Sequence, residues 1–289
     1  MSAESTASEA ASARVAMRRV ACGSAIDTMD DVAVEAPLEI RVEGRTVAIT
    51  MRTPGHDREL AAGFLLSEGV IARRGDVFEI STCPSRAEGG GVVDVLLARP
   101  EAVDFARLTR HVFTASSCGL CGKSVVEDVL RQHPPLPAEG PLPEGFPIAP
   151  ELIFSLPEKL RAAQAAFEAT GGLHASALFD AAGNVLSLHE DVGRHNALDK
   201  VLGEAWLAGR WPLDRHLLLL SGRVSFELAQ KALAARIPVV AAISAPSSLA
   251  IATAEAGGLT LCGFVREGRM NVYTHPRRIA LDAETNGGL

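Results

Sequence analysis

The chain has 289 residues, of which 47% are hydrophobic, 22% are charged and only 4% are aromatic. This composition excludes an intrinsically disordered protein, and the length is sufficient for one large core with a smaller appendage. The formal net charge of -7 disfavours non-specific binding to nucleic acid or to an anionic membrane, so neither is an expected partner.

Cysteine usage and the N-terminal sequence indicate a cytoplasmic protein. The five cysteines are an odd number, and they are too sparse for a disulfide scaffold. The first residues lack the continuous apolar segment of a secretory signal, and Glu4 and Glu9 argue against a transit peptide. We therefore expect reduced thiols in a reducing compartment.

The N-terminal half is predicted to be a smaller, β-rich α+β portion. Residues 1–18 are rich in alanine and serine without hydrophobic periodicity, which predicts a disordered tail. In the portion spanning 19–133, β-rich runs on both sides of Glu43-Gly44 predict a hairpin, and residues 57–71 have helical periodicity. A proline-rich connection at 134–147 then separates this portion from the rest of the chain.

A pair of thiols lies near the end of this portion. The sequence SSCGLCGKSVVEDVL, which begins at Ser116, places Cys118 and Cys121 just before a predicted helix. A helix N-terminus and the charge of Lys123 would both lower the pKa of a thiol and make it a better nucleophile. The pair is compatible with a redox switch, a sulfur carrier or a purely structural role, whereas the lack of a second C-x-x-C disfavours zinc.

Residues 148–289 are predicted to form a three-layer α/β/α domain. A helix over 151–170, a hairpin over 174–191 and a helix over 196–209 come first. Buried strands and helices then alternate, which is typical of βαβ units on a parallel sheet. The apolar stretch at 237–264 is interrupted by proline and glycine, so it predicts a buried strand, helix and strand rather than a membrane span.

Polar residues cluster where these strands are followed by helices. In HEDVGRHNALDK, which begins at His189, Arg194 and His195 lie near a helix N-terminus, which suits a phosphate or a carboxylate. A capped helix with a solvated charged turn fits the same residues equally well.

Two later strand-to-helix turns are expected to face one crevice, because ligands bind at the carboxyl ends of the strands in an open α/β sheet. The first turn contains Ser221, Gly222 and Arg223, and the second contains four small residues, Ser244, Pro246, Ser247 and Ser248. Their amides and hydroxyls suit a phosphate ester, although serine helix caps give the same pattern. Neither G-x-x-x-x-G-K-[ST] nor G-x-G-x-x-G occurs, which disfavours a nucleoside triphosphatase and a Rossmann dehydrogenase.

Five motifs in a fixed order carry a resemblance to a known family. These motifs are SSCGLCGK, DVGRHNALDK, SGRVSFELAQKA, ISAPSSLAI and FVREGRMNVYTH. Together they make the chain from Ala36 to Arg278 resemble the formate dehydrogenase accessory protein family (FdhD), which consists of sulfurtransferases for the molybdenum cofactor. The resemblance implies a cytoplasmic homodimer whose α/β/α domain has a cytidine deaminase-like fold.

The resemblance also implies a reaction. The C-x-x-C accepts sulfur as a persulfide from a cysteine desulfurase and passes it to bound Mo-bis(molybdopterin guanine dinucleotide), and formate dehydrogenase thereby becomes active. By resemblance, Cys118 carries the persulfide and Cys121 assists its transfer or release. No structural metal is expected.

The same resemblance implies which residues bind the cofactor. The segment that matches the family's cofactor-binding segment consists of Phe264, Val265, Arg266, Glu267, Gly268 and Arg269. We expect the guanidinium groups of Arg194, Arg223, Arg266 and Arg269 to hold phosphates, with His195 and Gly222 in the same site. We expect Ser221, Phe226 and Ser244 to line the nucleotide pocket.

Two other functions compete with this interpretation. A zinc-dependent deaminase uses H-x-E followed later by P-C-x-x-C, but here the cysteines precede the HED sequence and Cys118 does not follow a proline. A non-catalytic chaperone would bind and deliver the molybdenum cofactor while its thiols were structural. Stoichiometric zinc would favour the deaminase, and the absence of a persulfide on either Cys118 or Cys121 would favour the chaperone.

Overall fold

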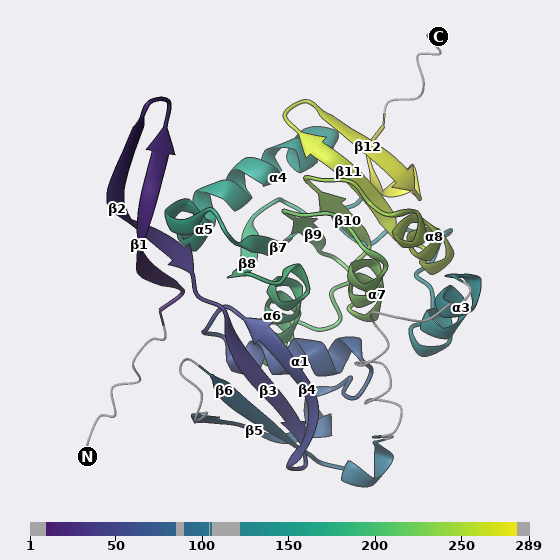
Figure 1. Cartoon of the computed structure of the whole chain (residues 1–289). Coiled ribbons are helices and arrows are strands. Elements are labelled where there is room, and N and C mark those ends of the chain that lie inside the picture. The colour runs from purple at the N-terminus through teal and green to yellow at the C-terminus, as the bar shows by residue number, and fades with distance from the viewer. Residues whose placement is uncertain (1–9, 85–89, 104, 106–121, 282–289) are drawn as a thin grey trace.

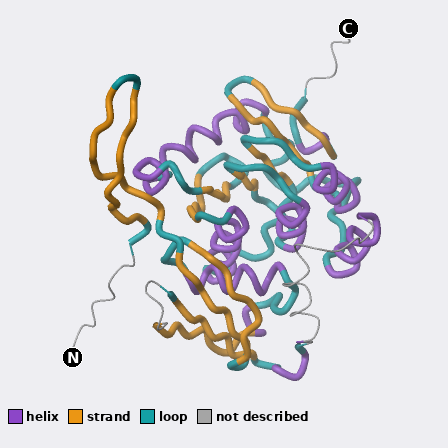
Figure 2. The backbone as a smooth tube through the Cα atoms, in the orientation of Figure 1, coloured by secondary structure: helices purple, strands orange, loops and turns teal. Residues whose placement is uncertain are grey.

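The structure is a computed structural model, and it describes residues 10–84, 90–103, 105 and 122–281. Within these residues the strands form three sheets, of two, four and six strands (Figure 1). Figure 2 shows helices on the outside of the largest sheet. None of the helices in the described ranges is long and apolar enough to cross a membrane.

The first sheet is a hairpin of β1 (Ser12–Ala21) and β2 (Ser24–Ala33), which are antiparallel throughout their length. Residues 12–18 therefore lie in a strand, whereas the sequence led us to expect a disordered tail. The tight turn at Gly23, where φ is 77°, allows the two strands to pair along their whole length. The hairpin contacts α5 (Ala165–Thr170) but leaves large apolar side chains exposed on both strands.

The second sheet carries the smaller N-terminal portion. Its strand order is β4 (Arg45–Arg52), β3 (Ala36–Val42), β6 (Gly91–Leu97) and β5 (Val77–Pro84). The predicted hairpin between β3 and β4 is confirmed, and Glu43 and Gly44 turn with φ of 53° and 72°. The predicted helix is α1 (Asp57–Ser67), whose Leu60 and Leu65 pack against the apolar face of this sheet.

The third sheet is the centre of the C-terminal domain. Its strand order is β12 (Arg269–Thr274), β11 (Thr260–Arg266), β10 (Val239–Ala242), β9 (Leu217–Leu220), β7 (His174–Phe179) and β8 (Val185–Asp191). Strands β9, β10 and β11 are parallel, while β7 is antiparallel to β9 and forms a hairpin with β8.

Helices cover both faces of this sheet (Figures 1 and 2). Helix α4 (Pro150–Ala163) packs on the face that carries Leu217 and Leu219. The opposite face, which carries Leu218 and Leu220, is covered by α6 (Arg194–Leu207), α7 (Phe226–Ala234) and α8 (Ser248–Gly257), with α3 (Gly122–Gln132) beside α8. Neighbouring leucines of β9 face opposite cores because successive side chains of a strand alternate. The chain is therefore a mixed α/β protein, as predicted.

The helix expected over 151–170 is two helices, α4 and α5, which meet at Gln164. The backbone of Gln164 leaves the helical region, with φ of -87° and ψ of 69°. The break is stabilised by Glu190, whose carboxylate accepts hydrogen bonds of 2.9 Å and 2.8 Å from the backbone N–H groups of Ala166 and Phe167. A carboxylate at this end also complements the dipole of α5.

The N-terminal portion is joined to the C-terminal domain by a close crossing of α1 and α6. A methyl group added at Gly63 would overlap the backbone carbonyl of Asp199, and one added at Gly203 would overlap that of Glu59. Only glycine allows the two backbones to approach this closely. Trp206 of α6 completes the core of the four-stranded sheet, so the two parts share a buried interface.

Candidate functional site

Several segments that are distant in the sequence meet at one end of the six-stranded sheet. Because β7 is antiparallel to β9, its first residue, His174, lies beside the carboxyl end of β9. His174 also pairs with Asp191, the last residue of β8. The loops after β8, β9, β10 and β11 therefore converge on the edge where α/β proteins bind ligands. We call this end of the sheet the strand-end edge.

Backbone hydrogen bonds hold the loops after β9, β10 and β11 together. The N–H of Val224 donates to Ala245 O at 3.1 Å, and the N–H of Phe264 donates to Ser244 O at 3.1 Å. These bonds bring Ser221, Gly222 and Arg223 of the first loop close to Ser244 of the second, as the sequence predicted. The side chain that caps α8 is Ser247, whose Oγ accepts a hydrogen bond from Ala250 N at 3.2 Å.

The segment from Phe264 to Arg269 is the end of the hairpin formed by β11 and β12. Phe264 has φ of 53° and an exposed side chain, and Arg266, Glu267, Gly268 and Arg269 are all exposed at the tip. Val265 differs from its neighbours because its side chain is 0% exposed and packs in the core beneath the sheet. The expected contact of Val265 with the cofactor is therefore not supported by this structure, in which the whole residue is buried.

Most polar residues of HEDVGRHNALDK serve the structure. Asp191 and Lys200 form a buried ion pair of 2.7 Å, and Lys200 also donates to Thr53 O at 2.8 Å. Asn196 donates to Met51 O at 2.8 Å. These contacts fasten the end of β4 to the C-terminal domain. These residues are buried and no side chain caps α6, so the capped helix with a solvated charged turn that the sequence also allowed is wrong for this part of the motif.

Two residues of this motif stay directed at the strand-end edge. Arg194 has a buried Nε that forms no hydrogen bond in the described part of the chain. His195 Nε2 lies 3.2 Å from Ser225 Oγ and 3.7 Å from a carboxylate oxygen of Glu227. The nearby imidazole of His195 lowers the pKa of Glu227 to about 2. Phe226, in the same turn, packs partly against the core.

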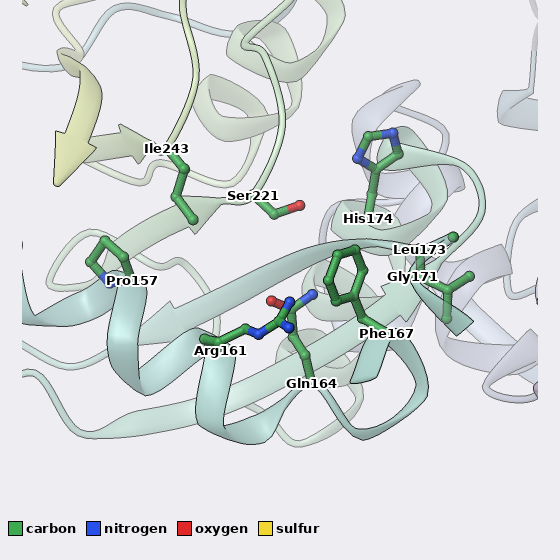
Figure 3. A pocket seen from close by; sticks show the side chains of 10 residues that line it. Pro157, Arg161, Gln164, Phe167, Gly171, Leu173, His174, Ser221 and Ile243 are labelled. Carbon is green, nitrogen blue, oxygen red and sulfur yellow. The ribbon is translucent and has the colours of Figure 1, made fainter. Parts of the chain in front are cut away.

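A cavity of about 440 Å³ lies beside this edge, between the α4–α5 junction and the sheet (Figure 3). Its volume is in the range of about 300–1,000 Å³ that is typical of small-molecule sites. The lining residues are Pro157, Arg161, Gln164, Phe167, Gly171, Gly172, Leu173, His174, Ser221 and Ile243. Of these, only Ser221 was predicted from the sequence, because the other polar residues follow no recognised motif.

His174 lies where the cavity meets the strand-end edge. Burial lowers the pKa of His174, and the positive charges of Arg194 and His195 lower it further. Because the pKa is lower in the folded than in the unfolded protein, the associated stabilisation is complete above about pH 6.5. It is lost as the pH falls through the folded-state value.

We therefore expect Arg194→Gln to raise the pKa of His174 towards its ordinary value, because the substitution removes one of the charges that disfavour protonation. Imidazole proton shifts followed by NMR across a pH titration measure this change. The control is Arg210→Gln, which removes a guanidinium that interacts with Glu204 instead. An unchanged His174 titration in Arg194→Gln would contradict the proximity of the two groups.

The two thiols of the C-x-x-C, Cys118 and Cys121, lie outside the described residues. The helix predicted after them is confirmed as α3, which begins at Gly122. Among the described cysteines, Cys22 and Cys83 are exposed, and burial raises the pKa of the Cys262 thiol to about 12. Cys262 is therefore a poor nucleophile. The described ranges contain no group of three or more histidine, cysteine or acidic side chains placed to bind a metal ion.

Comparisons with known proteins agree on one family. The model of the FdhD/NarQ family matches residues 33–280. A sulfur carrier protein FdhD from Streptomyces avermitilis is 48% identical over 281 residues, which cover 93% of this chain and 96% of the relative. One from Mycobacterium tuberculosis is 48% identical over 279 residues, covering 93% of this chain and 99% of the relative.

A solved structure is also similar. A protein assigned as a formate dehydrogenase accessory protein from Desulfotalea psychrophila matches with a TM-score of 0.72 at 26% sequence identity. The match covers 93% of this chain and 100% of that chain. The similarity therefore extends over both the four-stranded and the six-stranded sheets.

Proposed function

The chain belongs to the FdhD/NarQ family, and from this premise we propose that it is a sulfurtransferase for the molybdenum cofactor. It receives sulfur from a cysteine desulfurase as a persulfide and delivers it to Mo-bis(molybdopterin guanine dinucleotide). The recipient of the sulfurated cofactor is formate dehydrogenase. A sulfur-transfer role is supported by relatives that are named sulfur carrier proteins and align over nearly the whole chain.

The first chemical step is a thiolate exchange at sulfur. The Cys118 thiolate attacks the outer sulfur of the desulfurase persulfide, so that a new S–S bond forms on Cys118. The S–S bond of the donor breaks, and the donor cysteine leaves as a thiolate. A reducing cytoplasm keeps Cys118 available for this attack.

In the second step, the Cys121 thiolate attacks the inner sulfur of the Cys118 persulfide. The outer sulfur leaves with the bonding electron pair as sulfide, while Cys118 and Cys121 are oxidised to a disulfide. A dithiol reductant must then restore both thiols before the next cycle. This step gives the second cysteine of the C-x-x-C a defined role.

The observation that carries the proposal is the convergence of basic and polar groups at the strand-end edge. Arg223 lies in the loop of Ser221, which is hydrogen-bonded to the loop of Ser244, and Arg266 lies at the end of the adjoining β11. The charge of Arg194 acts on His174 at the same edge of the sheet. Guanidinium groups and backbone amides are the donors that pyrophosphate requires. We propose that this edge holds the phosphates of the cofactor, and that the sheet order reflects a cytidine deaminase-like domain.

The phosphate assignment is tested with Arg223→Ala. Removal of an exposed guanidinium that bonds a phosphate is expected to weaken binding of guanosine diphosphate about 10-fold or more, as measured by isothermal titration calorimetry. The matched control is Arg215→Ala, because Arg215 is exposed but pairs with Glu144. Equal affinities for the parent and Arg223→Ala would contradict the assignment. The homodimer stays a prediction, which sedimentation of the purified protein tests.

A further inference from the structure

We propose that the cavity at the α4–α5 junction binds the guanine base of the nucleotide, and that Gln164 selects this base by hydrogen bonding to its edge. The inference rests on the proposed function, since it assigns a place to the guanine of the same cofactor. It adds a base pocket to the phosphate site, and its central residue, Gln164, belongs to none of the five sequence motifs.

The first argument is the state of the Gln164 side chain. Gln164 is only 6% exposed, yet its amide forms no hydrogen bond with any residue in the described ranges. Its side chain lines the cavity and points into it beside Arg161 (Figure 3). Because this amide lines the open cavity and is not enclosed by protein, a ligand there can replace the hydrogen bonds that it makes with water.

The backbone explains why this amide faces the cavity. Gln164 is the residue at which α4 ends and α5 begins, so it is the junction residue of both helices. In a continuous helix, the direction of the Gln164 side chain would follow from the helical repeat. The break is stabilised by the Glu190 carboxylate on the N-terminus of α5, and it orients Gln164 independently of that repeat.

The second argument is the shape and polarity of the walls. Phe167, Pro157 and Ile243 provide apolar surfaces to the cavity. The guanidinium of Arg161 lies over the ring of Phe167, 4.6 Å from its centroid, and so holds the ring in place. A flat heteroaromatic ring with a polar edge fits such walls. Its carbonyl accepts from the Gln164 amide, and its adjacent ring N–H donates to the Gln164 carbonyl.

The third argument is charge, which favours a neutral base here over a phosphate. Among the described residues that line the cavity, Arg161 is the only one with a permanent positive charge, and it already pairs with Glu168 at 2.9 Å. The depressed pKa of His174, which burial and then the charges of Arg194 and His195 cause, favours its neutral form. The cavity therefore lacks an unpaired positive charge that would bind an anion, whereas the neighbouring strand-end edge contains arginines.

The two sites are continuous through Ser221. This residue lines the cavity and also begins the loop after β9 that contains Arg223. A nucleotide whose base fills the cavity would therefore extend its phosphates over Ser221 towards the strand-end edge. Together, the cavity and the strand-end edge fit one ligand that has an uncharged end and a charged end.

The test measures binding of guanosine diphosphate and of inorganic pyrophosphate to the full chain by isothermal titration calorimetry. Gln164→Met keeps the length of the side chain but removes its hydrogen bonds. It is expected to weaken guanosine diphosphate binding about 5- to 100-fold and to leave pyrophosphate binding unchanged. Gln164→Glu keeps an acceptor for the N–H groups of guanine and is expected to retain most of the affinity.

The controls separate this inference from the proposed function. Arg223→Ala should weaken both ligands, and the exposed Glu158→Gln on α4 should weaken neither. Parent-like binding of guanosine diphosphate by Gln164→Met, with weakened binding by Arg223→Ala, would overturn the base pocket and leave the proposed function standing. Equal losses of affinity for guanosine diphosphate and pyrophosphate in Gln164→Met would also overturn the base pocket. A parent chain that binds no guanosine diphosphate would instead overturn the proposed cofactor.

Discussion

Cys118→Ala is expected to abolish sulfur transfer, lowering activation of formate dehydrogenase by at least about 1,000-fold, while guanosine diphosphate binding stays within about twofold. Loss of a covalent nucleophile removes the reaction path itself, which explains the size of the effect. Binding should survive because the proposed phosphate and base sites consist of residues of the C-terminal domain. The measurement is reconstitution with a cysteine desulfurase, the cofactor and apo formate dehydrogenase.

The controls for this prediction use the other cysteines. Cys83→Ala, at an exposed position outside the C-x-x-C, should leave transfer unchanged. Cys121→Ala should still accept sulfur but release it slowly, because no second thiol is present to attack the persulfide. Full activity of Cys118→Ala would assign the thiols a structural role and favour a cofactor chaperone.

Lys200→Met is expected to lower the free energy of unfolding by about 3–5 kcal/mol, because it leaves the buried carboxylate of Asp191 without its ion-pair partner. The Asp191 and Lys200 side chains are 0% and 1% exposed, and their charged atoms are 2.7 Å apart. The loss should be large because Lys200 also binds Thr53 O and thereby joins the end of β4 to α6. Urea unfolding followed by circular dichroism measures it.

The matched control is an exposed ion pair of similar length. Arg18 and Asp27 are 3.0 Å apart, but their side chains are 66% and 79% exposed. Arg18→Met should therefore change the free energy of unfolding by less than about 1 kcal/mol. Similar effects for Lys200→Met and Arg18→Met would show that the buried pair does not join the two parts of the protein.

The sequence was sufficient where local patterns determine the structure. Alternating buried strands and helices predicted the parallel part of the six-stranded sheet, and Glu43-Gly44 predicted the β3–β4 hairpin. The convergence of the Ser221 and Ser244 loops was also predictable, because parallel strands end at the same edge of a sheet. In each case the sequence pattern that makes the prediction lies within one or two helices or strands.

Contacts between distant segments were not predictable in this way. The break between α4 and α5 at Gln164 is stabilised by Glu190, which lies on β8. The hydrophobic periodicity of residues 151–170 does not indicate this break. Asp191 and Asn196 belong to the motif in which Arg194 and His195 were interpreted as an anion site, but their own partners are Thr53 and Met51 of the N-terminal portion. The β1–β2 hairpin was missed because its alanines and serines gave no hydrophobic periodicity.

The central claim, that Cys118 carries a persulfide, is tested most directly by mass spectrometry. The chain is incubated with a cysteine desulfurase and cysteine, and its peptides are mapped without reducing agent. The account predicts an increase of about 32 Da, the mass of one sulfur atom, on the peptide at Cys118. An unmodified Cys118, with or without sulfur on Cys121, would contradict it.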